Sequence, residues 1–323
     1  MPNTENKPFI TKQTLLDTHQ RIRPYIHKTP VLTSQTIGRM SGAQVYFKCE
    51  NFQKMGAFKM RGATNAILQL SDGQRARGVA SHSSGNFAQA VSLAAQNLGV
   101  KAYIVMPSDS PEVKKAAVRD YGGKITECTP TLQAREDTVA KVIERTGATF
   151  LHPYNDYAVI AGQATAAMEL LEEIPDLDYI IPPVGGGGLA AGTALAAHFF
   201  SPKTKVTGAE PLGADDAWKS LKKGEIVLQA KPQTIADGLR TNLGDKTFAI
   251  LSQYLERIIL VEESEIINAL RLLMERMKIV VEPSGAVPLA ALLKEKESFA
   301  GKRVGIIVSG GNVDLKQLGG LFG

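Results

Sequence analysis

The sequence of 323 residues has little cysteine, no long apolar run and no recognisable targeting segment. Its two cysteines, Cys49 and Cys128, are too few for a disulfide framework, and their isolation excludes the usual zinc-binding spacings. No window approaches 18 apolar residues free of charge and glycine, which excludes a membrane-spanning helix. The N-terminus, MPNTENKPF, shows neither an apolar signal core nor an Arg-rich transit pattern. We therefore expect a soluble protein in a reducing, cytoplasmic setting.

Clustered positive charge is also absent, although Lys and Arg total 37 against 32 Asp and Glu. The basic residues are scattered, and the pair Lys222–Lys223 is the nearest approach to a cluster, so we expect no nucleic-acid-binding stripe. Apolar residues make up 44% of the chain and charged residues 21%, which excludes collagen-like, disordered and coiled-coil proteins. The length is that of one large or two ordinary globular domains.

Short β-branched segments alternate with amphipathic or Ala-rich segments along most of the chain. Strands are predicted over residues 78–82, 102–106, 124–126, 178–181, 205–209 and 304–308, and helices over 88–98, 111–120, 136–145 and 189–200. Strands that alternate with helices of this length indicate βαβ units around a parallel sheet. The sequence therefore predicts an α/β fold, and Pro153 and the pair Pro182–Pro183 favour a division into two lobes.

The 30 glycines are unevenly distributed, and Gly185 to Gly188 form an unbroken run between a predicted strand and a predicted helix. Backbone N–H groups at a helix start are unpaired, and glycines let the backbone fold closely around an anion, so this loop predicts a phosphate site. A dinucleotide is the competing ligand, because the run continues to Ala190 as G-x-G-x-x-A and Glu210 follows at the distance of a ribose-binding acid. Against it, Pro182 and Pro183 interrupt the strand that would precede such a fingerprint.

Three further motifs carry groups suited to chemistry. Lys59 is flanked by Phe58 and Met60, and burial would lower its pKa and leave a nucleophilic amine. Ser83–Asn86 offers hydroxyls and backbone donors to a carboxylate, and Ser309 ends a buried strand where open α/β sheets place ligands. Taken singly, the first two have ordinary alternatives, a solvated lysine and a simple helix cap. Taken together with the glycine run, the motifs favour a pyridoxal phosphate site.

In order and spacing, five motifs resemble the fold-type II pyridoxal phosphate enzymes, and most of all the serine racemase, serine/threonine dehydratase and 3-hydroxyaspartate dehydratase group. The motifs are Phe47–Gln53, Gly56–Ala63, Ser83–Asn86, Gly185–Gly188 and Ser309–Asn312. The resemblance covers residues 22–315 and implies a tryptophan synthase β-like fold, with the cofactor in the cleft between two twisted α/β lobes. It also implies a large domain of residues 1–75 and 156–323, a small domain of residues 76–155, and a homodimer.

The resemblance assigns roles to individual residues. Lys59 is the implied Schiff-base lysine and moves the α-proton on one face of the cofactor, while Ser84 works from the opposite face. Ser309 contacts the pyridine nitrogen, and a hydroxyl there leaves the nitrogen largely neutral, which favours loss of a β-substituent. The implied cofactor-binding residues are Phe58, Lys59, Asn86, Gly185, Gly186, Gly187, Gly188, Gly238, Glu282 and Ser309. The implied substrate-binding residues are Ser83, Ser84, Asn86 and Arg135.

Arg135 is the implied residue that could hold the second carboxylate of a hydroxyaspartate substrate. The alternative for an arginine on a helix is an ordinary surface ion pair. Phe87 departs from the group, which usually carries histidine beside the substrate carboxylate, and this departure leaves the preferred substrate open.

The same resemblance implies a divalent-cation site at Glu210, Ala214 and Asp216. Two carboxylates and a backbone carbonyl are hard oxygen ligands, which suit Mg²⁺ or Ca²⁺ and not zinc. The competing interpretation is two exposed acids near a helix start. The dinucleotide hypothesis also needs Glu210, as a ribose-binding acid, so the role of Glu210 separates that hypothesis from the cation site.

The resemblance therefore predicts a pyridoxal phosphate-dependent dehydratase. Its substrate would be L-serine, L-threonine or 3-hydroxyaspartate, its products a 2-keto acid and ammonia, and serine racemisation a further or even the chief activity. Two alternatives stay open. One is an NAD-dependent dehydrogenase that uses Gly185, Gly187, Ala190 and Glu210, and the other is a non-catalytic phosphate-binding protein in which Lys59 is idle.

Overall fold

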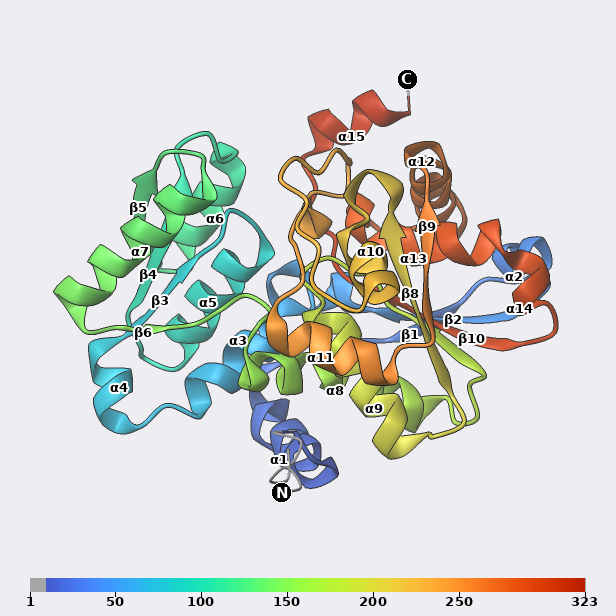
Figure 1. The fold of residues 1–323 in the computed structure, drawn as a ribbon, viewed down its shortest axis with the longest axis horizontal. Helices are drawn as coiled ribbons and strands as arrows, with labels where there is room; N and C mark the ends of the chain where they lie inside the picture. The colour runs from blue at the N-terminus through green and yellow to red at the C-terminus, as the bar shows by residue number, and fades with distance from the viewer. Residues whose placement is uncertain (1–9, 323) are drawn as a thin grey trace.

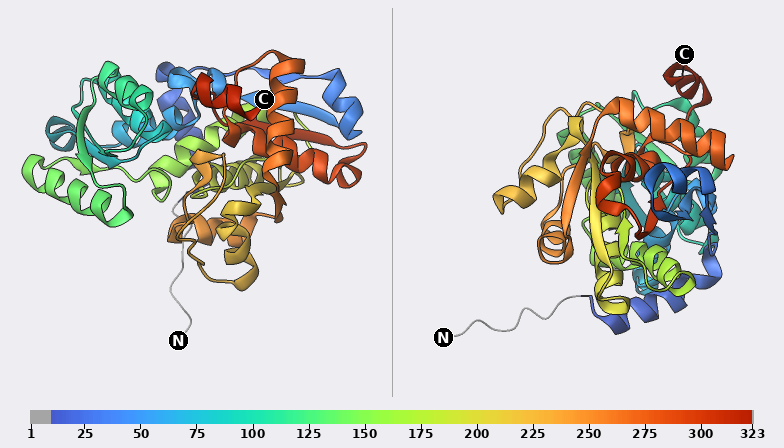
Figure 2. Two further views of the ribbon diagram at one scale, coloured as in Figure 1. Left: turned by 90° about the horizontal axis from the view of Figure 1, so that it is seen from above. Right: turned by 90° about the vertical axis from the view of Figure 1, so that its right-hand side faces the viewer.

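The computed structural model describes residues 10–322, and the strands in this range form two separate sheets. The polar N-terminus discussed above lies outside this range. Figure 1 shows the two sheets in two lobes arranged along the long axis of the molecule, and Figure 2 shows the same division from above. We call the lobe with the four-stranded sheet the small lobe and the other the large lobe.

The six-stranded sheet of the large lobe runs in the order β1-β2-β10-β7-β8-β9. Its strands are β1 (Val31–Thr33), β2 (Gln44–Cys49), β7 (Tyr179–Ile181), β8 (Lys205–Pro211), β9 (Arg257–Val261) and β10 (Arg303–Val308). Among these strands only β1 is antiparallel to its neighbour, so the other five have their carboxyl ends at one edge, where open α/β sheets bind ligands. The glycine run follows β7, and Ser309 follows β10.

The four-stranded sheet of the small lobe is parallel throughout the described residues and runs in the order β5-β4-β3-β6. Its strands are β3 (Val79–His82), β4 (Ala102–Pro107), β5 (Lys124–Cys128) and β6 (Thr149–Phe150). The helices α4 (Asp72–Arg77), α5 (Asn86–Asn97), α6 (Glu112–Asp120) and α7 (Leu132–Thr146) belong to this lobe, as can be followed in Figure 1. The last begins at Leu132 and not at residue 136, because the Thr131 hydroxyl caps it by accepting a hydrogen bond from the Ala134 N–H.

Helices pack on both faces of the six-stranded sheet. Consecutive residues of β10 show this, because Ile306 belongs to one buried apolar cluster and Ile307 to another. The helices outside the small lobe are α1 (Lys12–Ile22), α2 (Gln35–Ser41), α3 (Lys59–Leu68), α8 (Tyr157–Glu173), α9 (Gly188–Phe200), α10 (Asp216–Lys223), α11 (Asp245–Tyr254), α12 (Glu263–Leu272), α13 (Pro283–Lys294), α14 (Lys296–Phe299) and α15 (Leu315–Leu321). This layered arrangement buries both faces of a parallel sheet, as such sheets require.

Close packing of α3, α8 and α9 links the helix that begins at Lys59 to the helix that follows the glycine run. A Cβ at Gly162 of α8 would lie 2.6 Å from the Arg61 carbonyl oxygen in α3. A Cβ at Gly192 of α9 would lie 2.7 Å from the Ala164 nitrogen in α8. Any side chain at either glycine would therefore push neighbouring helices apart.

A buried ion network lies beneath the start of α3, and we define it by Lys48, Glu50, Arg61 and Glu169. Arg61 donates from Nε to Glu50 Oε2 and from Nη2 to Glu169 Oε2, each at 2.7 Å, and Lys48 Nζ donates to Glu169 Oε2 at 2.7 Å. Burial alone would raise the pKa of Glu169, but hydrogen bonds from His19 and Arg61 outweigh it and hold that pKa well below its usual range. Two positive and two negative charges thus balance inside the protein.

The α/β class and the helices and strands predicted from the sequence are confirmed, with shifts of a few residues at their ends. The sequence pattern does not indicate β1, β2, β6 or β9, of which β1 and β6 are very short. Within residues 10–322 no helix combines the length and the apolar character that crossing a bilayer demands.

Candidate active site

Lys59 is the first residue of α3, and backbone contacts hold it beside the end of β10. Gly56 makes the turn before it with a φ of 78°, and a Cβ at this glycine would collide with the side chain of Asn312. The Phe58 N–H donates to the Ser309 carbonyl at 3.0 Å. The lysine and the residue expected to face the pyridine nitrogen are therefore held together by adjacent stretches of backbone.

The amine of Lys59 lies close to both lobes. Its Nζ donates to the Pro153 carbonyl at 2.6 Å and lies 5.1 Å from the centre of the Phe58 ring and 5.5 Å from that of Phe87. Burial lowers the pKa of Lys59 to about 7, and the negative charge of Glu282 opposes this shift only in part. A large fraction of the amine is therefore neutral and nucleophilic at physiological pH.

Asn86, at the start of α5, connects the small lobe to the large lobe. Its Nδ2 donates to both carboxylate oxygens of Glu282, at 2.9 and 3.1 Å, and its Oδ1 accepts a hydrogen bond from Asn312 Nδ2 at 2.9 Å. Burial, followed by the charge of Asp237, raises the pKa of Glu282 to about 7. Near neutral pH Glu282 is thus partly protonated, and it can act as a donor or as an acceptor.

The run from Gly185 to Gly188 forms the turn between β7 and α9. Gly187 has a φ of 85°, which favours glycine, and Cβ atoms at Gly186 and Gly188 would collide with Tyr154. No hydrogen bond within the described part of the chain uses the N–H of Gly185, Gly186 or Gly187. These free donors at the start of α9 fit an anion such as a phosphate group.

Gly238 and Ser309 lie close to these residues. Gly238, in the 3-10 helix η5 (Asp237–Leu239), donates through its N–H to Ser284 Oγ at 3.1 Å, and its carbonyl oxygen would lie 3.2 Å from a Cβ at Gly185. The Ser309 side chain is buried, and its hydroxyl has no hydrogen-bond partner among residues 10–322. It is therefore free to donate to a bound group.

Comparison with known proteins decides which family this site belongs to. The family described as pyridoxal-phosphate dependent enzyme matches residues 22–310. The chain belongs to this family. A β-hydroxyaspartate dehydratase of Paracoccus denitrificans is 50% identical over 308 residues, which are 95% of this chain and 98% of the relative. A serine racemase of Dictyostelium discoideum is 50% identical over 313 residues, 96% of this chain and 97% of the relative. The crystal structure of a serine racemase from that organism superposes with a TM-score of 0.91 over 94% of this chain and 99% of that one.

The residues of this pyridoxal-phosphate-dependent enzyme fit the cofactor. The glycine run offers unpaired N–H groups to a phosphate, and Lys59 offers a partly neutral amine to a carbonyl. Family membership confirms the resemblance to fold-type II enzymes and rules out the dehydrogenase and the non-catalytic hypotheses. Glu210 is buried, and each of its carboxylate oxygens accepts a hydrogen bond from a backbone N–H group at the start of α10.

Ser83 and Ser84 lie in the turn between β3 and α5 of this enzyme, just before Asn86. The Ser83 N–H donates to the Val105 carbonyl at 3.1 Å, and its hydroxyl accepts a hydrogen bond from the Gly85 N–H at 3.3 Å. Among the described residues no hydrogen bond involves the Ser84 hydroxyl. The turn therefore presents one free hydroxyl next to the first, unpaired N–H groups of α5.

Arg135 lies in the first turn of α7. Its Nε is buried without a hydrogen-bond partner, and no ion pair in the described part of the chain includes it, so the surface ion-pair alternative is not realised there. Burial, followed by the positive charge of Arg135, lowers the pKa of His82 to about 4. This electrostatic coupling places Arg135 near the end of β3 and hence near the serine turn.

Glu210 and Asp216, which we call the acidic pair, are buried, with exposures of 0% and 2%. Glu210 accepts hydrogen bonds at 2.9 Å from the N–H groups of Ala217 and Trp218, and Asp216 Oδ2 accepts one at 3.2 Å from the Leu243 N–H. The interpretation of two exposed acids is therefore wrong. No group of three or more His, Cys, Asp or Glu side chains within residues 10–322 could hold a metal ion.

No ion pair in the described part of the chain includes either member of the acidic pair. Burial, and then the charge of Asp216, raises the pKa of Glu210 well above its usual range. Burial raises the pKa of Asp216 to about 7. Two buried carboxylates without a counter-charge fit a hard divalent cation, with the carbonyl of the buried Ala214 as a third oxygen ligand.

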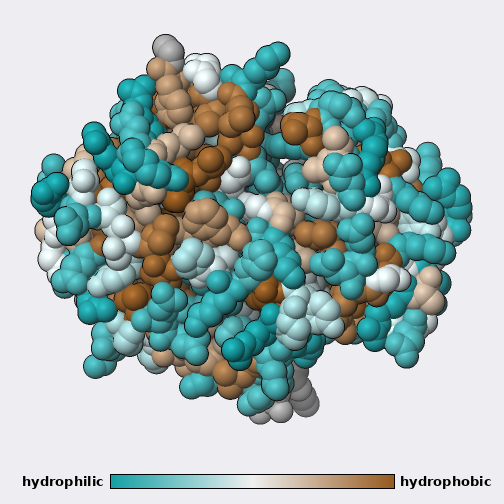
Figure 3. Space-filling model, turned by 180° about the vertical axis from the view of Figure 1, so that it is seen from behind, coloured by the Kyte–Doolittle hydropathy of each residue, from teal (hydrophilic) through white to brown (hydrophobic). Residues whose placement is uncertain are grey.

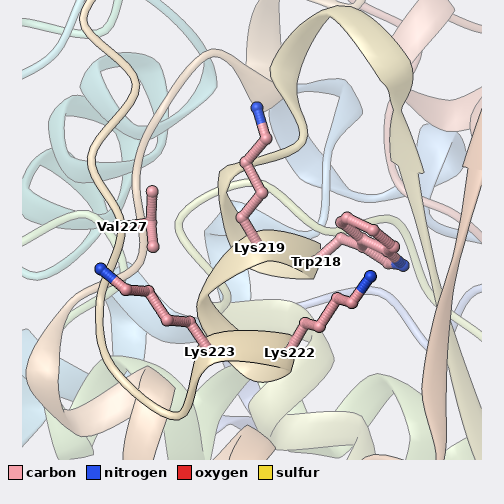
Figure 4. Close-up of a pocket in the computed structure, with 5 residues that line it drawn as sticks. All are labelled: Trp218, Lys219, Lys222, Lys223 and Val227. Atoms are coloured by element: carbon pink, nitrogen blue, oxygen red, sulfur yellow. The ribbon is translucent and has the colours of Figure 1, made fainter.

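A surface hollow of about 450 Å³ lies on α10 and is separate from this site. It is lined by Trp218, Lys219, Lys222, Lys223 and Val227, which Figure 4 shows as sticks. Lys222 Nζ lies 4.7 Å from the centre of the Trp218 ring. None of the predicted site residues lines this hollow.

Sequence reasoning missed three groups that surround Lys59 and the glycine run. They are the carbonyl of Pro153, the side chain of Tyr154 and the amide of Asn312. Asn312 belongs to one of the five motifs, so its position was a usable signal. No pattern marks Pro153, because it acts through its backbone, or Tyr154, because it acts by filling space.

Proposed function

We propose that this enzyme removes water from a β-hydroxy amino acid and releases a 2-keto acid and ammonia. The observation that carries the proposal is a partly neutral Lys59 amine at the same sheet edge as free phosphate-binding donors and the Ser309 hydroxyl. A β-hydroxyaspartate dehydratase and a serine racemase, each 50% identical to this chain, support the choice of substrate class. The candidate substrates are L-serine, L-threonine and 3-hydroxyaspartate.

Bound pyridoxal phosphate supplies a carbonyl that condenses with amines and a ring that withdraws electrons from the α-carbon of a substrate. The chain supplies the rest. The N–H groups of Gly185 to Gly188 would hold the phosphate, Phe58 and Gly238 would cover the ring, and Asn86 with Glu282 would contact its polar edge. Ser309 would donate a hydrogen bond to the ring nitrogen, and the Nζ of Lys59 would take the α-proton.

The substrate carboxylates are held by groups of the small lobe. The hydroxyls of Ser83 and Ser84, with the unpaired N–H groups at the start of α5, receive the α-carboxylate. Arg135 receives a second carboxylate, which would favour 3-hydroxyaspartate over serine, because its buried Nε has no partner within the described residues. Loss of Arg135 would then lower the rate with 3-hydroxyaspartate much more than the rate with serine.

The decisive experiment measures keto acid and ammonia from both enantiomers of serine and threonine and from all isomers of 3-hydroxyaspartate. We expect release from at least one L-amino acid by the wild-type holoenzyme and none by the Lys59→Ala variant. Absence of keto acid from every substrate, with the cofactor spectrum intact, would overturn the proposal. Arg135→Leu, measured with serine and with the preferred isomer of 3-hydroxyaspartate, separates the two substrate classes.

Racemisation of serine is a second candidate function, favoured by the free hydroxyl of Ser84. A two-sided proton transfer needs a second acid or base besides Lys59, and Ser84 is the residue proposed for it. We expect Ser84→Ala to lower racemisation at least tenfold more than dehydration of L-serine. Equal losses, measured by chiral chromatography and keto-acid release, would show that Ser84 does not act on one face alone.

The proposal extends to a cation, to the assembly and to the location. The acidic pair, with the Ala214 carbonyl, would hold Mg²⁺ or Ca²⁺.

Residues 1–75 and 156–323 would form the large domain and residues 76–155 the small domain, and the separate four-stranded sheet supports this division. We also place the enzyme in the cytoplasm, in keeping with its two free cysteines.

A homodimer is proposed because apolar atoms gather on one face of the large lobe, seen at the upper left of Figure 3. Exposed apolar side chains of the large lobe include Phe52 at 45%, Val280 at 50% and Leu315 at 73%. Asn51 Nδ2 donates to the Val280 carbonyl at 3.1 Å, which brings the first two segments together. Sedimentation equilibrium tests the assembly, with Leu315→Lys expected to weaken it.

A further inference from the structure

The free amine of Lys59 has one hydrogen-bond acceptor and two aromatic neighbours. The acceptor is the carbonyl of Pro153, in the linker between β6 and α8, at 2.6 Å. The Phe58 ring belongs to the turn before α3, and the Phe87 ring belongs to the first turn of α5. Their centres lie 5.1 and 5.5 Å from Nζ, so the amine is enclosed by rings from both sides of the cleft.

Phe87 is the more rigid of the two rings. Its side chain is 2% exposed and belongs to the buried apolar cluster that contains Ala57, Met60 and Leu151, whereas Phe58 is only partly buried. A side chain packed on this many sides has no room for another rotamer. The Phe87 ring is therefore a fixed wall, and it presents no hydrogen-bond acceptor to the amine.

Three polar side chains of the site, Asn86, Glu282 and Asn312, are already engaged with each other. Asn86 donates to both oxygens of Glu282 and accepts from Asn312, which also donates to the Met55 carbonyl. A charged ammonium has three N–H donors, and Lys59 finds one acceptor for them among the described residues. A buried cation with unmet donors is destabilised relative to the neutral amine.

We propose that Phe87 is a positioning residue that, together with the carbonyl of Pro153, keeps the free amine of Lys59 neutral and aimed in one direction. The inference rests on the proposed function only in that Lys59 is the cofactor-binding lysine and proton acceptor. Phe87 acts by offering no hydrogen-bond acceptor to the amine. A polar side chain at this position would offer a second acceptor, favour the ammonium, and turn Nζ away from Pro153.

The test measures Lys59 itself, in apoenzyme from which the cofactor has been removed. Limiting acetic anhydride labels lysines in proportion to their neutral fraction, and mass spectrometry gives the label on Lys59 relative to the exposed Lys101 from pH 5.5 to 9.5. In the wild type we expect the labelling of Lys59 to reach half of its maximum near pH 7. Phe87→Gln adds a hydrogen-bond acceptor beside the amine, so the pKa of Lys59 should rise by at least one unit in this variant. That rise would lower the labelling of Lys59 at pH 6 about tenfold.

Phe87→Leu is the matched control, because it removes the ring and keeps the position apolar. Without the ring's attraction for a cation, the pKa of Lys59 should fall slightly or stay unchanged in Phe87→Leu, whereas it should rise in Phe87→Gln. Should Phe87→Gln fail to fold, Phe87→His conserves a ring and adds an acceptor, and is measured above pH 7.5, where imidazole is neutral.

A second readout is the pH dependence of the rate at which added pyridoxal phosphate combines with the apoenzyme, followed by its visible absorbance. The midpoint of this profile should shift upward in the polar variants and not in Phe87→Leu. Equal shifts in the polar and apolar variants, or a wild-type Lys59 whose labelling has no midpoint near pH 7, would overturn the inference. Failure of the proposed dehydration appears in the keto-acid assay and leaves these titrations unaffected.

Discussion

The buried ion network and the acidic pair are both charged clusters inside the large lobe, and they differ in the balance of charge. In the buried ion network Lys48 and Arg61 face two carboxylates, and the pKa of Glu169 lies well below its usual range. In the acidic pair two carboxylates face backbone N–H groups, and the pKa of Asp216 rises to about 7. Burial is similar in the two places, so the charged partner decides the direction of the shift.

The acidic pair is therefore incomplete without a proton or a cation. A buried carboxylate is tolerated when a cation or several hydrogen bonds offset the loss of water, and Glu210 with Asp216 has only the hydrogen bonds. The buried ion network therefore serves the structure around α3 by itself. The stability of the acidic pair at the start of α10 depends instead on the proton or cation that neutralises its carboxylates. Substitutions in one cluster leave the other cluster intact, so each cluster is the control for the other.

Arg61→Met should produce the largest effect, a loss of about 3–5 kcal/mol in the free energy of unfolding. The substitution keeps volume but leaves Glu50 and Glu169 buried with Lys48 as their remaining cation in the network. Guanidinium unfolding of the holoenzyme, followed by circular dichroism, measures the loss. Arg61→Lys should recover part of it, since it restores the charge without the two-sided hydrogen bonding. A loss below about 1 kcal/mol would show that the buried ion network contributes little.

The pH dependence of stability should have opposite signs in the two clusters. Asp216 titrates near 3.8 when unfolded and at about 7 when folded, so the folded state binds its proton more tightly. In metal-free protein this lowers stability as pH rises from about 4 to about 7, by about 2–4 kcal/mol. For Glu169, whose pKa is depressed, stability is lost instead as pH falls below its unfolded value.

Asp216→Asn isolates the contribution of the acidic pair to this pH dependence. The variant should show a smaller fall in stability between pH 5 and pH 7 than the wild-type holoenzyme shows in a chelator, because Glu210, whose pKa is also raised by burial, remains. Urea midpoints at half-unit steps of pH measure both proteins, and all other titrating groups are shared by the two. Parallel pH profiles would contradict the expected coupling of Asp216 to folding.

Chelation should cost the wild type about 2–3 kcal/mol of stability relative to a cation concentration a hundred times the dissociation constant. The thermal midpoint should fall in EDTA and recover with Mg²⁺ or Ca²⁺, because the cation neutralises two buried carboxylates. Glu210→Gln should show neither change, while Arg61→Lys, altered in the buried ion network, should respond like the wild type. A wild-type midpoint that ignores verified metal removal would argue against a cation at this place.

Much of the fold and of the site follows from the sequence, because strand ends and glycines leave local signals. The run at Gly185 to Gly188 predicts the turn between β7 and α9, and Ser309 at a strand end predicts a second site residue at the same sheet edge. Lys59 is predicted from its motif, but its pKa depends on residues distant in sequence, such as Glu282.

What the sequence does not reveal depends on pairing across the chain. The ion network joins Lys48 to Glu169 over 121 positions, and no local pattern indicates this partner. The same holds for Pro153, whose carbonyl approaches Lys59 from 94 positions away. The burial of Glu210 and Asp216 was equally hidden, since two acids near a helix start are exposed in most helices.

Lys219→Met should give the smallest effect, a loss below about 1 kcal/mol in the free energy of unfolding. Lys219 is a nearby cation and forms an ion pair with Asp215 at 2.8 Å, but its side chain is 48% exposed. An exposed pair of this kind contributes little, and the charge of Lys219 lowers the pKa of Asp216 only as its weakest influence. Thermal midpoints with and without cation should therefore differ by the same amount in Lys219→Met and wild type. A loss above about 2 kcal/mol would instead make Lys219 the counter-charge of the acidic pair, and the contrast between the two clusters would disappear.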